Sequence, residues 1–174
     1  MSLTLLATRL KQLEKTKVES GWFETSVYPD GTSAAYVASI QEYGYQGGGV
    51  NIPPRPFLRP AIANHSKQWA KLAATEGAKS LKGMETTTQA ANKLGLTIEG
   101  DILESMLDPK EPLSRVTLLL RKWRDEGRDI NKSTVEAARR ELANNPNVAV
   151  SSNTTPLSDT GYLMSSLTYE VTVK

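Results

Sequence analysis

The chain has 174 residues, which is enough for one domain, or one domain with a small annex. Its 21 Lys and Arg residues nearly balance its 19 Asp and Glu residues, which excludes a strongly basic nucleic-acid clamp and a strongly acidic tail. With no cysteine and one histidine, disulfides, thiol nucleophiles and zinc sites built from cysteine or paired histidines are excluded. The longest dense apolar run, Val116–Leu120, is much shorter than the ~18 residues of a membrane span, and we expect no secretory signal because no basic region precedes the first apolar residues.

The first elements are predicted to be a helix, a strand and a second helix. Residues 17–24 have the extended pattern of a strand, and a second helix over Ala34–Tyr43 ends at Gly44. The first helix is indicated by four leucines at steps of three and four, whose apolar side either packs on the core or docks a partner. They are Leu3, Leu6, Leu10 and Leu13.

Residues 45–54 are predicted to form a loop. Gly47, Gly48 and Gly49 give its backbone freedom, and two prolines stiffen its exit. The glycines do not form a phosphate-binding loop, because no Lys-Ser or Lys-Thr pair follows them. The segment is either a plain surface loop or an arm that becomes ordered on assembly, in which case Gly47 to Val50 would contact a neighbouring subunit.

Four helices are predicted in the middle of the chain from the recurrence of apolar residues at helical spacing. They cover Ala61–Leu81, Thr87–Leu107, Arg115–Glu126 and Val135–Asn144. Apolar residues that include Ile62 mark the inner side of the first of these helices. Gly95 and Gly100 indicate either close helix contacts or a bend. We expect one domain over residues 1–174, within which the helical region 85–150 is either an integral part or a sub-domain.

The clearest strand lies at the end of the chain. Leu167, Tyr169, Val171 and Val173 alternate with polar residues, which is typical of a strand buried on one face. Antiparallel pairing with residues 18–24 would join both ends of the chain. The predicted fold is therefore α+β: a small antiparallel sheet of N-terminal and C-terminal strands packs against several helices, with a helical middle.

The sequence offers few candidates for chemistry. His65 lies within a predicted helix and has no serine nucleophile on a sharp turn nearby. The carboxylates at 125–129 are interleaved with arginines and a lysine, which is typical of a solvated helix face. We therefore expect no catalytic residue, no metal and no cofactor. The arginines at 121–128 and 139–140 leave open an alternative function, a nucleic-acid-associated helical regulatory or binding module.

Three segments together resemble a known family. They are Ala35–Gly44, with its Glu-Tyr-Gly ending, Ile52–Ile62, with the run Pro-Pro-Arg-Pro-Phe-Leu-Arg-Pro, and Pro156–Leu167, with the run Pro-Leu-Ser-Asp-Thr-Gly. Their order resembles that of the neck and tail-completion proteins of tailed bacteriophages, also described as virion-morphogenesis or minor tail proteins. The resemblance spans residues 35–167. One difference is that residues 116–155 are longer and more helical here than is typical of the family.

The resemblance implies a structural protein without enzymatic activity. It would be assembled in the host cytoplasm and would lie in the virion where the head joins the tail. There it would form a ring, typically six-fold in this family, that completes the tail. Its partners would be further copies of itself and a head-closure, tail-terminator or tail-tube protein, with no membrane and no specific nucleic acid.

Within this resemblance, several residues are candidates for the interface. The prolines around Arg55, Phe57 and Arg59 would fix the backbone, so that Phe57 could enter a partner's pocket while the two arginines make bidentate contacts. Alternatively, the same segment fixes the start of the long helix against its own core. Asp159 is either a helix cap or an interface residue, and Gly47 to Val50 would be the arm between subunits.

Overall fold

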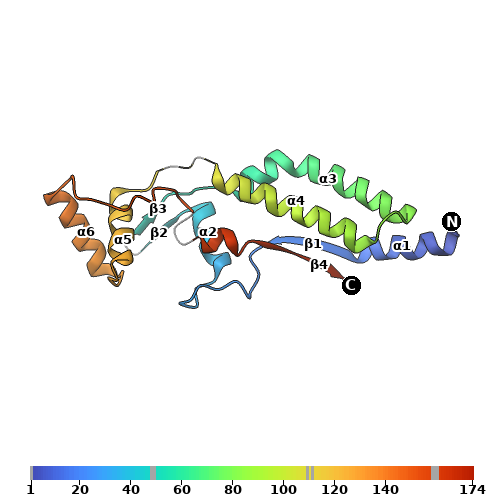
Figure 1. Cartoon of the computed structure of the whole chain (residues 1–174), viewed down its shortest axis with the longest axis horizontal. Helices are drawn as coiled ribbons and strands as arrows, with labels where there is room; N and C mark the ends of the chain where they lie inside the picture. The colour runs from blue at the N-terminus through green and yellow to red at the C-terminus, as the bar shows by residue number, and fades with distance from the viewer. Residues whose placement is uncertain (1, 48–49, 109, 111, 158–160) are drawn as a thin grey trace. The chain divides into compact units, whose positions relative to one another are not determined.

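The computed structural model describes residues 2–47, 50–108, 110, 112–157 and 161–174. The chain divides into two compact units, one made of Met1–Asp108 and Leu163–Lys174 and the other of Pro109–Tyr162. The described residues form an α+β fold in which paired N-terminal and C-terminal strands pack against helices, as the sequence predicts (Figure 1). Of the helical region expected at 85–150, residues 85–108 belong to the first unit and the rest to the second.

The elements of the first unit follow one another in chain order and include two long helices. They are α1 (Leu3–Lys15), β1 (Thr16–Gly21), α2 (Ala34–Tyr43), β2 (Tyr45–Gly47), β3 (Val50–Ile52), α3 (Leu58–Lys82), α4 (Thr87–Leu107) and β4 (Thr168–Val173). A short helix, α7 (Tyr162–Ser165), begins at the boundary between the units. No helix in the described part of the chain is both long and apolar enough to cross a bilayer.

The sheet β1–β4 joins segments from the two ends of the sequence. The strands are antiparallel, with Thr16 opposite Val173 and Val18 opposite Val171. The alternation predicted for β4 is largely confirmed, since Tyr169 and Val171 are partly covered while their neighbours are exposed. The alternation fails at the end of the strand, where Val173 is 57% exposed. In Figure 1 both strands run beside α4, which packs against them.

Helices α3 and α4 form a hairpin whose turn is closed by specific caps. Gly83 adopts a left-handed φ of 77° and ends α3, and the side chain and backbone of Thr86 form a capping box with Gln89 at the start of α4. Ile102 and Met106 lie fully buried on α4. The prediction was wrong for Ile62 of α3, which is 50% exposed because the small residue Ala61 is the one turned inward.

The expected loop at 45–54 contains a β-hairpin. Residues Tyr45–Gly47 pair antiparallel with Val50–Ile52, so the loop prediction was wrong for these six residues. The sequence does not predict these strands, because a strand of three residues is too short to show alternation and the glycines and prolines around it are typical of a loop. Gly48 and Gly49 lie outside the described residues.

The second unit contains α5 (Arg115–Asp125) and α6 (Lys132–Asn144), capped by Ser114 and Asn131. Leu118, Leu119 and Ala138 are buried. The segment after α6 is bound to α5 through its backbone, since Ser151 N donates to Leu118 O, and Nη1 of Arg121 donates to the carbonyls of Asn153 and Thr155. The buried guanidinium of Arg121 thus holds the extended segment in place. Further along, Leu157 has a left-handed φ of 65°, a strained conformation for a leucine.

A substitution at Gly95 tests how closely α4 packs on the sheet. A Cβ added at Gly95 would lie 2.2 Å from Cδ2 of Tyr169, whereas a Cβ at Gly100 of the same helix meets nothing within 4 Å. We expect Gly95→Ala to lower the free energy of unfolding by about 1–3 kcal/mol, because Tyr169 must leave its position. The measurement is denaturant unfolding followed by circular dichroism.

Gly100→Ala is the matched control, since the substitution is the same and the helix is the same. It should raise the free energy of unfolding by up to about 1 kcal/mol, because alanine favours the helix. Equal effects of the two substitutions would contradict the close contact between α4 and β4.

Candidate functional site

The carboxylate of Glu42 joins two of the segments that carry the family resemblance. Glu42, near the end of α2, is 1% exposed. Its Oε2 accepts hydrogen bonds from the backbone N–H groups of Phe57, at 2.7 Å, and Leu58, at 2.9 Å. Its Oε1 accepts from the backbone N–H of Arg59 at 3.2 Å and from Nε of the same residue at 2.8 Å. One side chain therefore caps the start of α3 from outside that helix.

The surroundings of Glu42 keep it ionised. Burial alone would raise the pKa of its carboxyl group, but the hydrogen bonds from the Phe57 N–H and the Arg59 guanidinium outweigh this, so that the pKa lies below its usual value. The first turn of α3 contributes a positive dipole end, which also favours an anion at this place. The junction is therefore a charge-assisted link between α2 and α3.

Phe57 lies in the core of its own unit and not at an interface. It is 0% exposed, and its ring packs edge-on against Trp22 with the ring centroids 5.6 Å apart. Ser105 of α4 donates a hydrogen bond to its carbonyl at 2.8 Å. The prediction that Phe57 enters a partner's pocket was therefore wrong, because the ring is buried within its own unit against Trp22, while the Phe57 backbone is bonded to α4.

Arg55 is also buried, at 6% exposure, and its backbone N–H donates to the carbonyl of Gln41. The side chain of Arg59, in contrast, is 57% exposed. Its Nη2 donates to the carbonyl of Glu42 at 2.8 Å, and its guanidinium lies 5.0 Å from the centroid of the Tyr43 ring. The structure thus supports the reading in which the proline-rich segment fixes the start of the long helix, with Arg59 on its outer side.

The other candidate interface residues are placed only in part. Gly47 ends β2 and Val50 begins β3. Gly48, Gly49 and Asp159 lie outside the described residues. A Cβ at Gly47 would lie 2.7 Å from the hydroxyl of Tyr45, so this glycine leaves room for the Tyr45 side chain to lie over its own strand.

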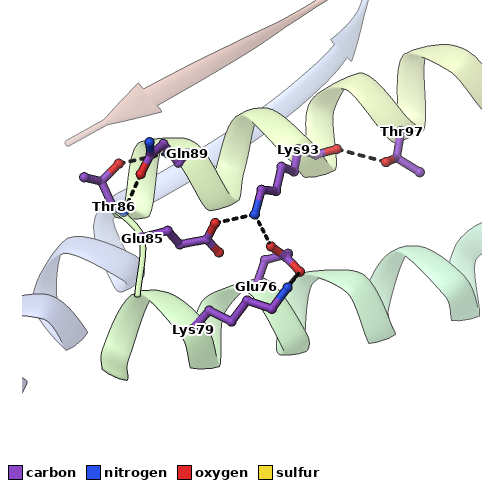
Figure 2. Close-up of polar contacts among 7 residues, drawn as sticks. All are labelled: Glu76, Lys79, Glu85, Thr86, Gln89, Lys93 and Thr97. Atoms are coloured by element: carbon purple, nitrogen blue, oxygen red, sulfur yellow. Dashed lines mark hydrogen bonds and ion pairs between the residues drawn. The ribbon is translucent and has the colours of Figure 1, made fainter. Parts of the chain in front are cut away.

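A second polar group, shown in Figure 2, lies between α3 and α4 at the other end of the hairpin. Lys93 of α4 bonds to Oε2 of Glu76 at 2.6 Å and to Oε2 of Glu85, and Lys79 bonds to the other oxygen of Glu76. The Glu76 side chain is 6% exposed. Hydrogen bonds from Lys79 and then Lys93 lower the pKa of Glu76 to about 2, and the two glutamates raise the pKa of Lys93. Among the described residues, Oε1 of Glu85 is buried without a hydrogen-bond partner.

A polar cavity of about 430 Å³ lies beside this ion-pair group. Its walls come from α1, the start of β1, the end of α3, the turn between α3 and α4, the start of α4 and the end of β4. They carry hydroxyl and amide groups together with one guanidinium and one carboxylate. The lining residues are Arg9, Gln12, Thr16, Ser80, Gly83, Glu85, Thr86, Thr87, Thr88, Gln89 and Val173. Arg9 closes one side by donating to the carbonyl of Leu81 at 3.1 Å.

The single histidine lies in a polar group between α3 and α4. Its Nδ1 is 3.6 Å from Oδ2 of Asp101, and the same oxygen accepts a 2.6 Å hydrogen bond from the indole of Trp69. The rings of His65 and Trp69 stack with centroids 6.2 Å apart. These contacts link the two helices. Within the part of the chain that the structure describes, no group of three or more His, Asp or Glu residues could hold a metal ion.

The basic residues at 122–128, which are among those on which the nucleic-acid alternative depends, have acidic or aromatic neighbours. Arg124 pairs with Asp125 at 2.9 Å, and the Arg128 guanidinium lies 4.6 Å from the centroid of the Trp123 ring. Lys122 and Arg128 each lie 3.8 Å from a carboxylate oxygen of Glu126. The carboxylates therefore offset much of the positive charge along this helix.

Comparison with protein-family models, with curated proteins and with solved structures found no match to this chain. Sequence reasoning did not single out Glu42, although the residue lies in a quoted motif. Its role could have been suspected from the order of two motifs, because one predicted helix ends in Glu-Tyr-Gly and the next begins at Pro-Phe-Leu-Arg.

We expect Glu42→Gln to lower the free energy of unfolding by about 2 kcal/mol, because the charge-assisted bonds to α3 become neutral ones. Glu42→Ala should cost about 3 kcal/mol or more, since the N–H groups of the helix start and Arg59 lose their acceptor. Denaturant unfolding measures both. Glu24→Gln, at an exposed glutamate, is the control and should change stability by less than about 0.5 kcal/mol. Unchanged stability in both Glu42 variants would contradict the capping role.

The depressed pKa of Glu76 predicts a dependence of stability on pH. A carboxylate whose pKa falls from 4.5 to about 2 on folding stabilises the fold above pH 4.5, and this contribution is lost as the pH falls toward 2. The melting temperature of Glu76→Gln should therefore lie below that of the wild type near neutral pH, and the gap should narrow in acid. Glu104→Gln, at an exposed glutamate of α4, should show no such convergence. A gap that stays constant across this range would contradict the assignment.

Proposed function

We propose that the chain is a structural virion protein of a tailed bacteriophage, acting in tail completion and head–tail joining as a subunit of an oligomeric ring at the neck. The observation that carries the proposal is the junction at Glu42. Two segments on which the family resemblance depends, 35–44 and 52–62, meet there through the carboxylate and the start of α3. The residues of these two segments therefore act together in this fold, since they attach α2 to the start of α3.

The proposed role needs surfaces and no reactive centre. A subunit of a closed ring uses two different complementary faces, one for each neighbour. Tyr36, Tyr43 and Tyr45 are 57%, 68% and 43% exposed around α2 and the β2–β3 hairpin, and Arg59 lies over Tyr43. Tyrosine and arginine are enriched in protein interfaces, so this surface suits contact with another copy or with a head-closure, tail-terminator or tube protein.

The test is removal of the protein from a phage that encodes it. Electron micrographs of the lysate should show heads and tails that remain unjoined, and supplying the wild-type chain in trans should restore joined, infectious particles. Supplying Gly100→Ala should restore them as well, because that substitution lies in open space on the first unit.

Infectious virions formed without the chain would overturn the proposal. The nucleic-acid module is the alternative, and its expected result differs. The purified chain would bind duplex DNA with an affinity that falls steeply with salt, because each phosphate contact releases counterions, while particles would still assemble without it.

A further inference from the structure

Most of the large apolar side chains exposed in the first unit lie toward the two ends of the α3–α4 hairpin, with Leu96 in the middle of α4 as an exception. At the α1 end, Leu3 is 85% exposed, Leu6 36% and Leu10 48%. Within α1, which is described throughout, no residue is buried. Leu13 packs on α3, where its Cδ2 would lie 3.8 Å from a Cβ added at Gly77, whereas the earlier turns of α1 extend past the end of the helical hairpin (Figure 1).

We call these leucines of the first two turns of α1, Leu3, Leu6 and Leu10, the leucine face. A helix of 13 residues is marginal by itself in water, and much of this one has its apolar side in solvent. Met84, in the turn after α3, adds a further side chain that is 73% exposed. The exposed apolar side chains at this end of the unit are thus suited to being covered by another protein surface.

The tyrosine face lies at the other end of the hairpin. We define it by Tyr36 and Tyr43, seven residues apart on one side of α2, and Tyr45 at the start of β2. Glu42 ties this face to the beginning of α3, and Arg9 ties α1 to the end of α3 at Leu81. Since α3 has 25 residues, the two faces are separated by about 37 Å along it, and one copy cannot bring them together.

The two faces also differ in charge. Helix α1 carries Arg9, Lys11 and Lys15 against one acidic residue, Glu14. Residues 18–54 contain four acidic residues and no Lys or Arg. Two of these four are paired within the chain, Glu19 with Lys17 and Glu42 with Arg59, so the buried Glu42 carboxylate offsets the exposed Arg59 guanidinium that lies over Tyr43. Glu24 and Asp30 are exposed in the segment that precedes α2, where Asp30 accepts a hydrogen bond from the Thr32 N–H. The basic side chains of α1 and these two exposed carboxylates are complementary in charge.

We propose that copies of this chain associate head to tail, with the leucine face of one copy packed on the tyrosine face of the next. This deepens the proposed function, because it identifies which two surfaces a ring subunit would use. The occupant is a second copy, since both halves of the contact lie on one chain, at opposite ends of the hairpin, with basic residues on α1 at one end and exposed carboxylates in the segment before α2 at the other. Such a heterologous contact closes into a ring when the rotation per copy allows it and otherwise grows into a filament.

The experiment uses two full-length variants, each altered on one face. Leu6→Lys with Leu10→Lys places charge on the leucine face, and Tyr36→Lys adds a positive charge to the tyrosine face. Analytical ultracentrifugation should show oligomers for the wild type and a monomer for each variant by itself. Circular dichroism and thermal melting establish that each variant is folded.

Mixing the two variants gives the decisive result. Each retains one intact face, so the mixture should form a one-to-one dimer and nothing larger. Leu96→Lys is the matched control, because Leu96 is 58% exposed in the middle of α4, away from both faces. That variant should associate as the wild type does.

Three results would overturn the inference: a mixture that stays monomeric, variants that associate as the wild type does, or a wild type that is monomeric at about 1 mM, where an interface with a Kd of 1 mM would already be half occupied. None of these results decides the proposed function, since a chain that is needed for joined particles can use other faces. Conversely, head-to-tail oligomers of a chain that virions do not need would support this inference while overturning the virion role.

Discussion

The first unit depends on one buried carboxylate. Glu42 accepts three backbone N–H groups at the start of α3 and the guanidinium of Arg59, and so replaces the water that these donors would otherwise need. Because the capping group comes from α2 and not from α3 itself, the same contact that starts the long helix also fixes α2 against it. The burial of Phe57 below this junction follows, since the backbone at residue 57 is held on one side by Glu42 and on the other by Ser105.

The α3–α4 hairpin connects the junction at Glu42 to the rest of the unit. At its far end the two helices are joined by the ion pair of Glu76 with Lys93, and Arg9 attaches α1 to the last turn of α3. On the opposite side of α4, Gly95 lets the Tyr169 ring approach the helix backbone, which brings the β1–β4 sheet close. The hairpin therefore separates the two ends of the unit, which present surfaces of different chemistry.

Much of this architecture could be predicted from periodicity, and the rest depends on contacts between distant residues. The leucine spacing of α1 and the alternation in β4 are local patterns, and the structure has a helix and a strand at those places. Glu42 could not be assigned a role from its own surroundings, because a glutamate at the end of a helix is usually solvated and its partners lie 15 residues further on. Phe57 shows the converse error, since a phenylalanine between prolines fits a partner's pocket as well as its own core. Strands β2 and β3 have three residues each, too few for a pattern.

The pairing of β1 with β4 has a consequence for biosynthesis. Residues 109–162 form their own compact unit between α4 and β4, so the ribosome delivers the whole of that unit before the last strand of the other. During that interval β1 has an open edge and α4 lacks the Tyr169 ring that fills the space at Gly95. The synthesis of the second unit is therefore complete before the first unit has its last strand. The pairing of β1 with β4 must then close a loop of about 150 residues, and such long-range contacts slow folding.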